Sequence, residues 1–176
     1  TAGIALPGIH LARLHRTGQN PPVSRIAVRP VQDNELPAVA HLRWQWVMEN
    51  EGPVELSRPE FVDRFVAWAH ANRTTHHCTV AVQDTAVVGM AWLAVAPRVP
   101  SPSAVPRANG DIQCVYVTRD HRNLGVTDAL TAALITRANE LGLERITVHS
   151  SDQALGVYRR HGFTDSSLLM EKILRE

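Results

Sequence analysis

Residues 111–141 have the sequence DIQCVYVTRDHRNLGVTDALTAALITRANEL, which predicts a strand, then a polar turn, then a helix. The first seven residues alternate between two faces of a strand, with Ile112, Cys114 and Tyr116 on one face and Asp111, Gln113, Val115 and Val117 on the other. From Leu130 onward, apolar residues recur at three- and four-residue spacing up to Gly142, which is typical of a helix that ends at a glycine. We expect the rest of the fold to be organised around this unit.

The polar turn at residues 118–125 predicts an anion site. A helix that follows a strand through such a turn offers its unpaired N–H groups and the positive end of its dipole to a ligand. Arg122 adds a planar cation that suits phosphate oxygens, and Gly125 allows close approach of the backbone. The alternative is that Arg122 is a solvated loop arginine and that Gly125 only eases the turn. The turn alone leaves both interpretations open.

The same residues resemble a known motif. Val115-Tyr116-Val117, then four residues, then Arg122-x-x-Gly125 and a helix, is similar to the acyl-CoA motif of the GNAT N-acetyltransferases, Arg/Gln-x-x-Gly-x-Gly/Ala. One helix and one strand later, the segment ALGVYRRHGF at residues 154–163 resembles the family's second motif, Asn-x-x-Ala-x-x-x-Tyr-x-x-x-Gly-Phe. Weaker similarity extends from about residue 25 to the C-terminus.

The sequence departs from both motifs at one position each. Thr127 stands where the first motif has glycine or alanine, and Ser151 stands where the second motif has asparagine. The resemblance still implies a single α/β (α+β) domain of the GNAT type, with a mixed central sheet flanked by helices in the order β-α-α-β-β-β-α-β-α-β. We assign residues 24–176 to this domain. Residues 1–23, which contain several glycines and prolines, are expected to form an N-terminal extension.

Periodicity elsewhere in the chain agrees with this order. Alternating or apolar runs predict strands at residues 25–29, 76–83, 86–95, 144–149 and 163–174, and Asp33 begins a first helix. Ser57 and Glu60 have the spacing of a capping box for a second helix. Phe61, Phe65 and Trp68 lie on one face of that helix and are expected in the core.

The resemblance also implies an enzyme, an acetyl-CoA-dependent N-acetyltransferase in which a primary amine attacks directly in a ternary complex. It assigns coenzyme A binding to a set of residues in and after the central strand: Val115, Tyr116, Val117, Arg122, Asn123, Leu124, Gly125, Val126, Thr127, Ser151 and Tyr158. In the family, the tyrosine at the position of Tyr158 hydrogen-bonds the departing sulfur. Asp111 falls where some members have a catalytic glutamate, although it could instead cap a turn, with ordered water acting as the base.

The acceptor amine is open at this point, and a small amine, an aminoglycoside-like compound and a protein N-terminus or lysine all fit. The end of the first helix supplies Trp44, Trp46, Glu49 and Glu51, which would suit a cationic amine or could be solvated surface. Two other hypotheses are a non-catalytic acyl-CoA-binding regulatory or sensor module, and an α/β domain without a coenzyme A site.

Composition narrows the possible partners. The 176 residues carry a net charge of +1 and show no basic stripe, which argues against a nucleic-acid partner. No run reaches the ~18 apolar residues of a membrane span, and the two cysteines favour a reduced, cytoplasmic setting. The nine histidines lack the spacing of a metal site. A homodimer is possible by family resemblance.

Overall fold

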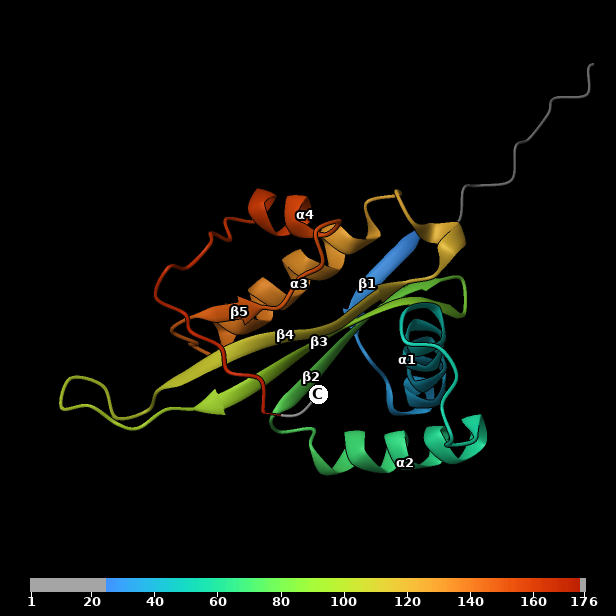
Figure 1. The fold of residues 1–176 in the computed structure, drawn as a ribbon, viewed down its shortest axis with the longest axis horizontal. Helices are drawn as coiled ribbons and strands as arrows, with labels where there is room; N and C mark the ends of the chain where they lie inside the picture. Colours follow the sequence, from blue (N-terminus) through green and yellow to red (C-terminus); the bar gives the residue numbers. More distant parts are fainter. Residues whose placement is uncertain (1–24, 175–176) are drawn as a thin grey trace, which may run out of the picture.

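A five-stranded sheet forms the centre of the computed structural model, which describes residues 25–174 (Figure 1). The strands lie in chain order: β1 (Ile26–Pro30), β2 (His76–Gln83), β3 (Ala86–Pro97), β4 (Ala108–Val117) and β5 (Ile146–Val148). Neighbours from β1 to β4 are antiparallel, whereas β4 and β5 are parallel because a helix crosses between them. The predicted mixed sheet is therefore confirmed. The expectation for residues 1–23 lies outside the described residues.

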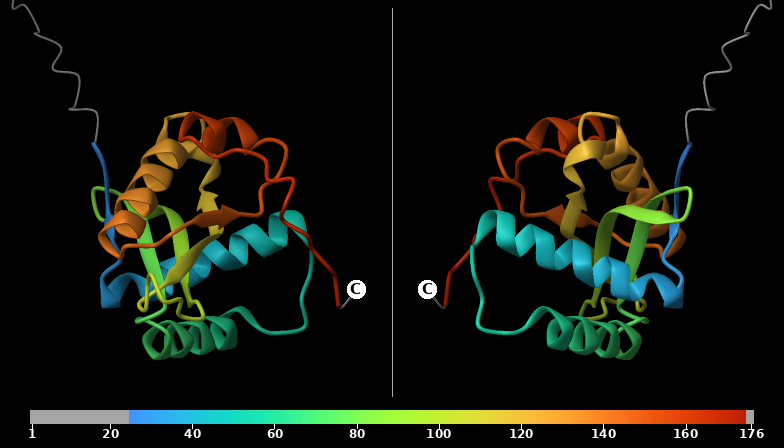
Figure 2. Two further views of the ribbon diagram at one scale, coloured as in Figure 1. Left: turned by 90° about the vertical axis from the view of Figure 1, so that its left-hand side faces the viewer. Right: turned by 90° about the vertical axis from the view of Figure 1, so that its right-hand side faces the viewer.

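Helices cover both faces of this sheet, as Figures 1 and 2 show. Helices α1 (Leu36–Asn50) and α2 (Arg58–Ala71) cover one face, and α3 (Val126–Glu140) and α4 (Leu155–Arg160) cover the other. Each face has its own apolar cluster, one containing Met90 and Trp92 of β3 and the other containing Leu130 and Leu134 of α3. No helix of the described part is both long and apolar enough to cross a membrane.

The hairpin of β2 and β3 and the start of α2 at Arg58 agree with the sequence prediction. The capping box does not form, because the Ser57 side chain caps nothing and Glu60 accepts a bond from Arg64 at 2.6 Å instead. The aromatic row of α2 packs toward the sheet, with Phe65 edge-on to Trp92, but Trp68 stays 41% exposed. The prediction that this row lies in the core is therefore confirmed for Phe65, which packs on the apolar cluster under α1 and α2, but not for Phe61, which belongs to neither cluster, or for Trp68.

A bulge in β4 corrects the predicted alternation. Met90 pairs with Tyr116 but Trp92 pairs with Gln113, so Cys114 and Val115 of β4 lie opposite a single residue of β3. The bulge shifts the side-chain pattern by one position. Cys114 and Tyr116 pack in the cluster under α1 and α2, whereas Ile112 packs against α3 on the opposite face.

The predicted faces were therefore wrong for two sets of residues. Ile112 does not share a face with Cys114 and Tyr116. Asp111 flanks Ile112 in the strand and so projects to the α1/α2 face, away from Val115 and Val117, which pack in the α3 cluster. The alternation rule failed because it assumes a regular strand, and the extra residue of a bulge breaks that regularity.

The predicted closing strand at residues 163–174 is absent. This segment contains no strand in the described structure, and its apolar side chains are exposed, among them Leu168 at 91% and Met170 at 93%. β5 is therefore an edge strand, and one side of its backbone has no strand partner among residues 25–174.

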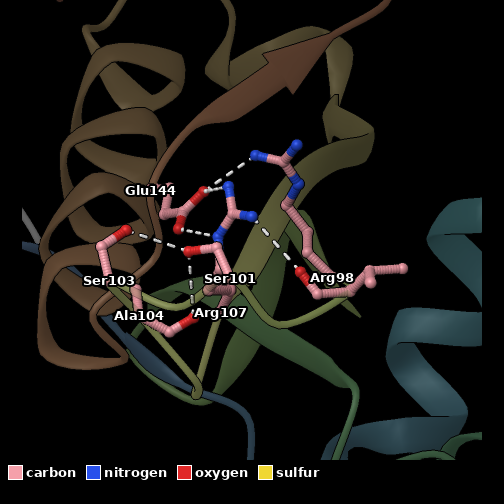
Figure 3. Close-up of polar contacts among 7 residues, drawn as sticks. Arg98, Ser101, Ser103, Ala104, Arg107 and Glu144 are labelled. Atoms are coloured by element: carbon pink, nitrogen blue, oxygen red, sulfur yellow. Dashed lines mark hydrogen bonds and ion pairs between the residues drawn. The ribbon is translucent and has the colours of Figure 1, made fainter.

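The long β3–β4 loop is held at its base by one carboxylate. Glu144 accepts hydrogen bonds from Arg98 at 2.8 Å and from Arg107 at 2.6 and 3.0 Å (Figure 3). Ser101 and Ala104 exchange backbone hydrogen bonds in the same loop. The loop leaves the end of the sheet at which β4 begins, so these contacts fix the start of the central strand.

Candidate functional site

β4 and β5 separate after three paired residues. Their parallel register joins Gly110 to Ile146, Asp111 to Thr147 and Ile112 to Val148, and then stops. Residues 113–117 of β4 continue beside β3, but their other edge has no strand partner within the described chain. This free edge includes Val115, Tyr116 and Val117. It can form backbone hydrogen bonds with an extended ligand in the way that a neighbouring strand would.

The turn after β4 presents backbone N–H groups at the start of α3. Asn123 and Gly125 both have left-handed backbones, with φ of 63° and 76°. Gly125 is the N-cap of α3 and provides no side-chain cap, so the N–H groups of Val126, Thr127 and Asp128 lack partners within the helix. A Cβ placed on Gly125 would meet no atom within 4 Å, which shows open space beside the turn.

The side chains of this turn differ in their surroundings. Leu124 is largely exposed, Val126 is buried in the α3 cluster, and Thr127 is partly buried at the first turn of the helix. Asp128 places a negative charge in the same turn, but Arg160 of α4 binds it with three hydrogen bonds of 2.9 to 3.1 Å. These hydrogen bonds lower the pKa of Asp128. Arg160 therefore offsets a charge that would otherwise repel an anion at α3.

Arg122 does not extend freely into solvent. Its Nε donates to the Val117 carbonyl at 3.0 Å, and its Nη2 donates to Glu49 Oε2 at 2.7 Å. Glu49 also accepts from the Tyr116 hydroxyl at 3.0 Å. The bond from Arg122 is the largest cause that lowers the pKa of Glu49. Burial, followed by the bond to Glu49, raises the pKa of Tyr116.

His121 provides a second support for the turn. Its Nδ1 lies 2.8 Å from Thr118 Oγ1, and its Nε2 lies 2.7 Å from Gln83 Oε1 in β2. Because an amide oxygen can only accept, Nε2 carries the proton and donates to Gln83 Oε1. The imidazole thereby ties the turn to a strand two positions away in the sheet.

Tyr158 of α4 lies on the α3 side of the sheet. It is 5% exposed, packs edge-on to Phe163 and belongs to the cluster that contains Ile112. Its ring also lines a cavity of about 990 Å³ between β5, α4 and residues 163–171. Burial raises the pKa of Tyr158, so the phenol stays protonated and remains a donor at neutral pH. Ser151 lies exposed between β5 and α4.

Asp111 lies on the opposite face, at the point where β4 and β5 still pair. Its carboxylate accepts from Gln113 at 2.8 Å and from the Thr147 hydroxyl of β5 at 3.1 Å. It therefore bridges two strands rather than capping a turn. Asp111 and Tyr158 lie on opposite faces of the sheet, near the point where β4 and β5 separate.

The sequence profile of the acetyltransferase (GNAT) family matches residues 38–163, which include both strands and the turn just described. The chain belongs to the GNAT acetyltransferase family. The predicted family and the prediction of an acetyltransferase enzyme are both confirmed by this match. Among proteins of curated function, none matches the sequence.

Solved structures with this GNAT fold come from organisms as different as a bacterium, a trypanosome and a plant. A predicted acetyltransferase from Clostridium acetobutylicum with acetyl-CoA is 15% identical, with a TM-score of 0.71 over 85% of this chain and 97% of its own. An acetyltransferase from Trypanosoma brucei is 24% identical, with a TM-score of 0.66 over 85% of this chain and 100% of its own. Glucosamine-6-phosphate N-acetyltransferase from Arabidopsis thaliana is 15% identical, with a TM-score of 0.66 over 86% and 99%. At these identities the likeness shows the fold.

Three supporting residues of this GNAT site were missed by sequence reasoning. His121 and Arg160 were assigned nothing, and Glu49 was considered only as part of an amine pocket or as solvated surface. Their partners lie 32 to 73 residues away in the chain. Contacts at such separations leave no local periodicity in the sequence, so only the fold reveals them.

Proposed function

We propose that this protein transfers an acetyl group from acetyl-CoA to a primary amine by direct attack in a ternary complex. The observation that carries the proposal is the free edge of β4, residues 113–117, which leads directly into a turn with unpartnered N–H groups. An extended, amide-containing arm suits the edge, and a phosphate group suits the helix start. The two features are adjacent in the chain, as a ligand with both parts requires.

The residues present fit coenzyme A. Left-handed backbones at Asn123 and Gly125 direct successive N–H groups toward one side, a conformation that favours anions. The space beside Gly125 is open, and Thr127 and Val126 would contribute N–H groups of the first helical turn. Val115 and Val117 would pair with the extended arm through their backbones. Ser151, exposed before α4, would provide a hydroxyl near the other strand.

Acetyl-CoA supplies a thioester carbonyl that an amine can attack, with the thiolate as leaving group. A backbone N–H of the free β4 edge would stabilise the charge that develops on the carbonyl oxygen. The Tyr158 hydroxyl would donate a hydrogen bond to the departing sulfur. A lysine-like amine is mostly protonated at pH 7, and removing its proton costs roughly 4 to 5 kcal/mol. Asp111 would accept that proton, directly or through water.

The test combines binding and turnover. Calorimetric titration with acetyl-CoA should give saturable binding. Gly125→Ala should weaken it by about tenfold, because the ~1–2 kcal/mol cost of alanine in a left-handed backbone makes the free turn relax to another conformation, which binding must reverse. With acetyl-CoA saturating, thiol release should be screened against polyamines, aminoglycosides and lysine peptides. No binding by the wild-type protein would refute the proposal, whereas binding with no turnover on any amine would favour a sensor.

Two variants separate the catalytic roles once an amine is found. Tyr158→Phe keeps the ring and removes the donor, so kcat should fall by about a hundredfold with unchanged acetyl-CoA affinity. Asp111→Asn should also lower kcat by about a hundredfold. If Asp111→Asn changes kcat less than twofold, the base is ordered water rather than this carboxylate.

A further inference from the structure

The Glu49 carboxylate at the end of α1 receives three donors from the site. Its Oε1 accepts from the Tyr116 hydroxyl at 3.0 Å and from Arg119 Nε at 3.1 Å, and its Oε2 accepts from Arg122 Nη2 at 2.7 Å. Residue 49 as a whole is exposed at the helix end, but its side chain is only 22% exposed. These three donors on one partly exposed carboxylate link the end of α1 to β4 and to the turn that follows it.

Two nitrogens of the Arg122 guanidinium already donate hydrogen bonds within the protein. Nε is bound to the Val117 carbonyl and Nη2 to Glu49, and the Arg122 Cζ lies 5.5 Å from the centre of the Tyr116 ring. Tyr116 packs in the apolar cluster under α1 and α2. The guanidinium is therefore held on that face of the sheet, whereas α3 packs on the other.

We propose that Glu49 is a positioning residue, which holds Arg122 as a brace between α1, the end of β4 and the turn at residues 118–125. The brace keeps the N–H groups at the start of α3 in a geometry that binds the phosphate of acetyl-CoA. In this role Arg122 fixes the backbone of the turn, and its guanidinium group does not itself bind the phosphate. The inference rests on the proposed function, because it explains how the protein would hold the N–H groups that bind the phosphate of acetyl-CoA.

The charges around Glu49 argue against the other role considered for it. Arg119 and Arg122 both pair with this one carboxylate. Its two oxygens already accept hydrogen bonds from three donors. We therefore expect Glu49 not to bind the acceptor, although its position at the end of α1 suggested that role.

The first experiment needs no cofactor. Hydrogen exchange of the free protein should show that Glu49→Gln speeds exchange of the His121 and Arg122 amides, which donate to the carbonyls of Thr118 and Arg119, by about tenfold, because the turn loses a brace and opens more often. Glu60→Gln is the matched control, since it removes an exposed glutamate–arginine pair on α2, far from the turn. Unchanged exchange in Glu49→Gln would overturn the inference, whatever the protein binds.

The second experiment is a double-mutant cycle on acetyl-CoA affinity measured by calorimetry. Glu49→Gln and Arg122→Ala should each weaken binding by about tenfold, and the double variant should be no weaker than either, because both remove the same brace. Additive losses would overturn the proposal. So would tighter binding by Glu49→Gln, which is the result expected if Glu49 merely withholds Arg122 from the phosphate.

Kinetics with the amine found in the screen distinguish positioning from catalysis. Glu49→Gln should raise the KM for acetyl-CoA and leave kcat and the KM for the amine within about twofold of wild type. A raised KM for the amine alone would mean that Glu49 binds the acceptor after all. Failure of the wild-type protein to bind acetyl-CoA would refute the proposed function, while the exchange experiment would still decide whether the brace exists.

Discussion

Cys114 is the residue at which β4 changes direction. Its φ of 52° lies in the left-handed region, where side chains other than glycine, asparagine and aspartate are seldom found. This conformation forms the bulge, which takes Cys114 and Val115 out of the regular register with β3 and lies just beyond the end of pairing to β5. The site therefore depends on a backbone conformation that cysteine adopts at some cost.

Glycine and alanine at position 114 provide a direct test of that cost. In an ordinary strand alanine is the more stable of the two, but at a left-handed backbone glycine avoids a penalty of ~1–2 kcal/mol. We expect Cys114→Gly to be more stable than Cys114→Ala by about 1 kcal/mol in urea unfolding. Cys114→Val should be the least stable, since a β-branched residue is the least suited to this region. Alanine more stable than glycine would mean that the bulge relaxes to a regular strand.

At the scale of elements, Glu144 joins the β3–β4 loop to the segment before β5. Glu144→Gln removes the charge that Arg98 and Arg107 share, so the loop should open more often. Exchange of the hydrogen-bonded loop amides of Arg98, Ser101 and Ala104 should rise by up to about fivefold at low salt and much less in 1 M NaCl, as expected for a partly exposed ion pair. Glu140→Gln, which breaks a pair within α3, is the control and should leave the loop unchanged.

Local patterns in the sequence were sufficient for most elements. The hairpin of β2 and β3, the helices α1 to α3 and the turn at residues 118–125 all follow from periodicity and turn residues that act within a few positions. The bulge in β4 and the missing strand at residues 163–174 did not follow. A bulge depends on pairing with another strand, and a closing strand forms only where pairing offsets the loss of chain entropy.

The candidate site could be predicted only in part for the same reason. The order of strand, turn and helix from Val115 to Thr127 could be predicted because these elements are consecutive in the chain, and the resemblance to the family motif made this stretch the candidate coenzyme A site. The orientation of Arg122 toward α1 was not predicted, since Glu49 lies 73 residues away. The predicted face of Asp111 was wrong, because the bulge lies between Asp111 and Val115 and shifts the alternation of side chains.

At the scale of the whole molecule, arginine–carboxylate pairs connect the layers. Glu35 binds Arg29 of β1, Glu49 joins α1 to the turn, Asp128 joins α3 to α4, and Glu144 joins two loops. In each case the hydrogen bond from arginine is the largest cause that lowers the pKa of the carboxyl group. The pairs lie at different points around the sheet. Protonation of their carboxyl groups should therefore weaken the fold in several places at once.

The sign of the pH dependence follows from the lowered pKa values. In the unfolded chain these groups titrate near 4.5 for glutamate and 3.8 for aspartate, so the unfolded state takes up protons first as pH falls. The stabilisation is complete above those values and is lost as pH drops through the lower folded pKa values. The unfolding temperature should therefore fall steadily from about pH 5 to about pH 2, and Glu35→Gln should make that decline shallower.

Salt at 1 M should also reduce the slope of unfolding temperature against pH, because most of these pairs are partly exposed and screened. An unfolding temperature that stays constant over this range would show that the pairs form equally well in the unfolded chain, or that their carboxyl groups keep ordinary pKa values when folded.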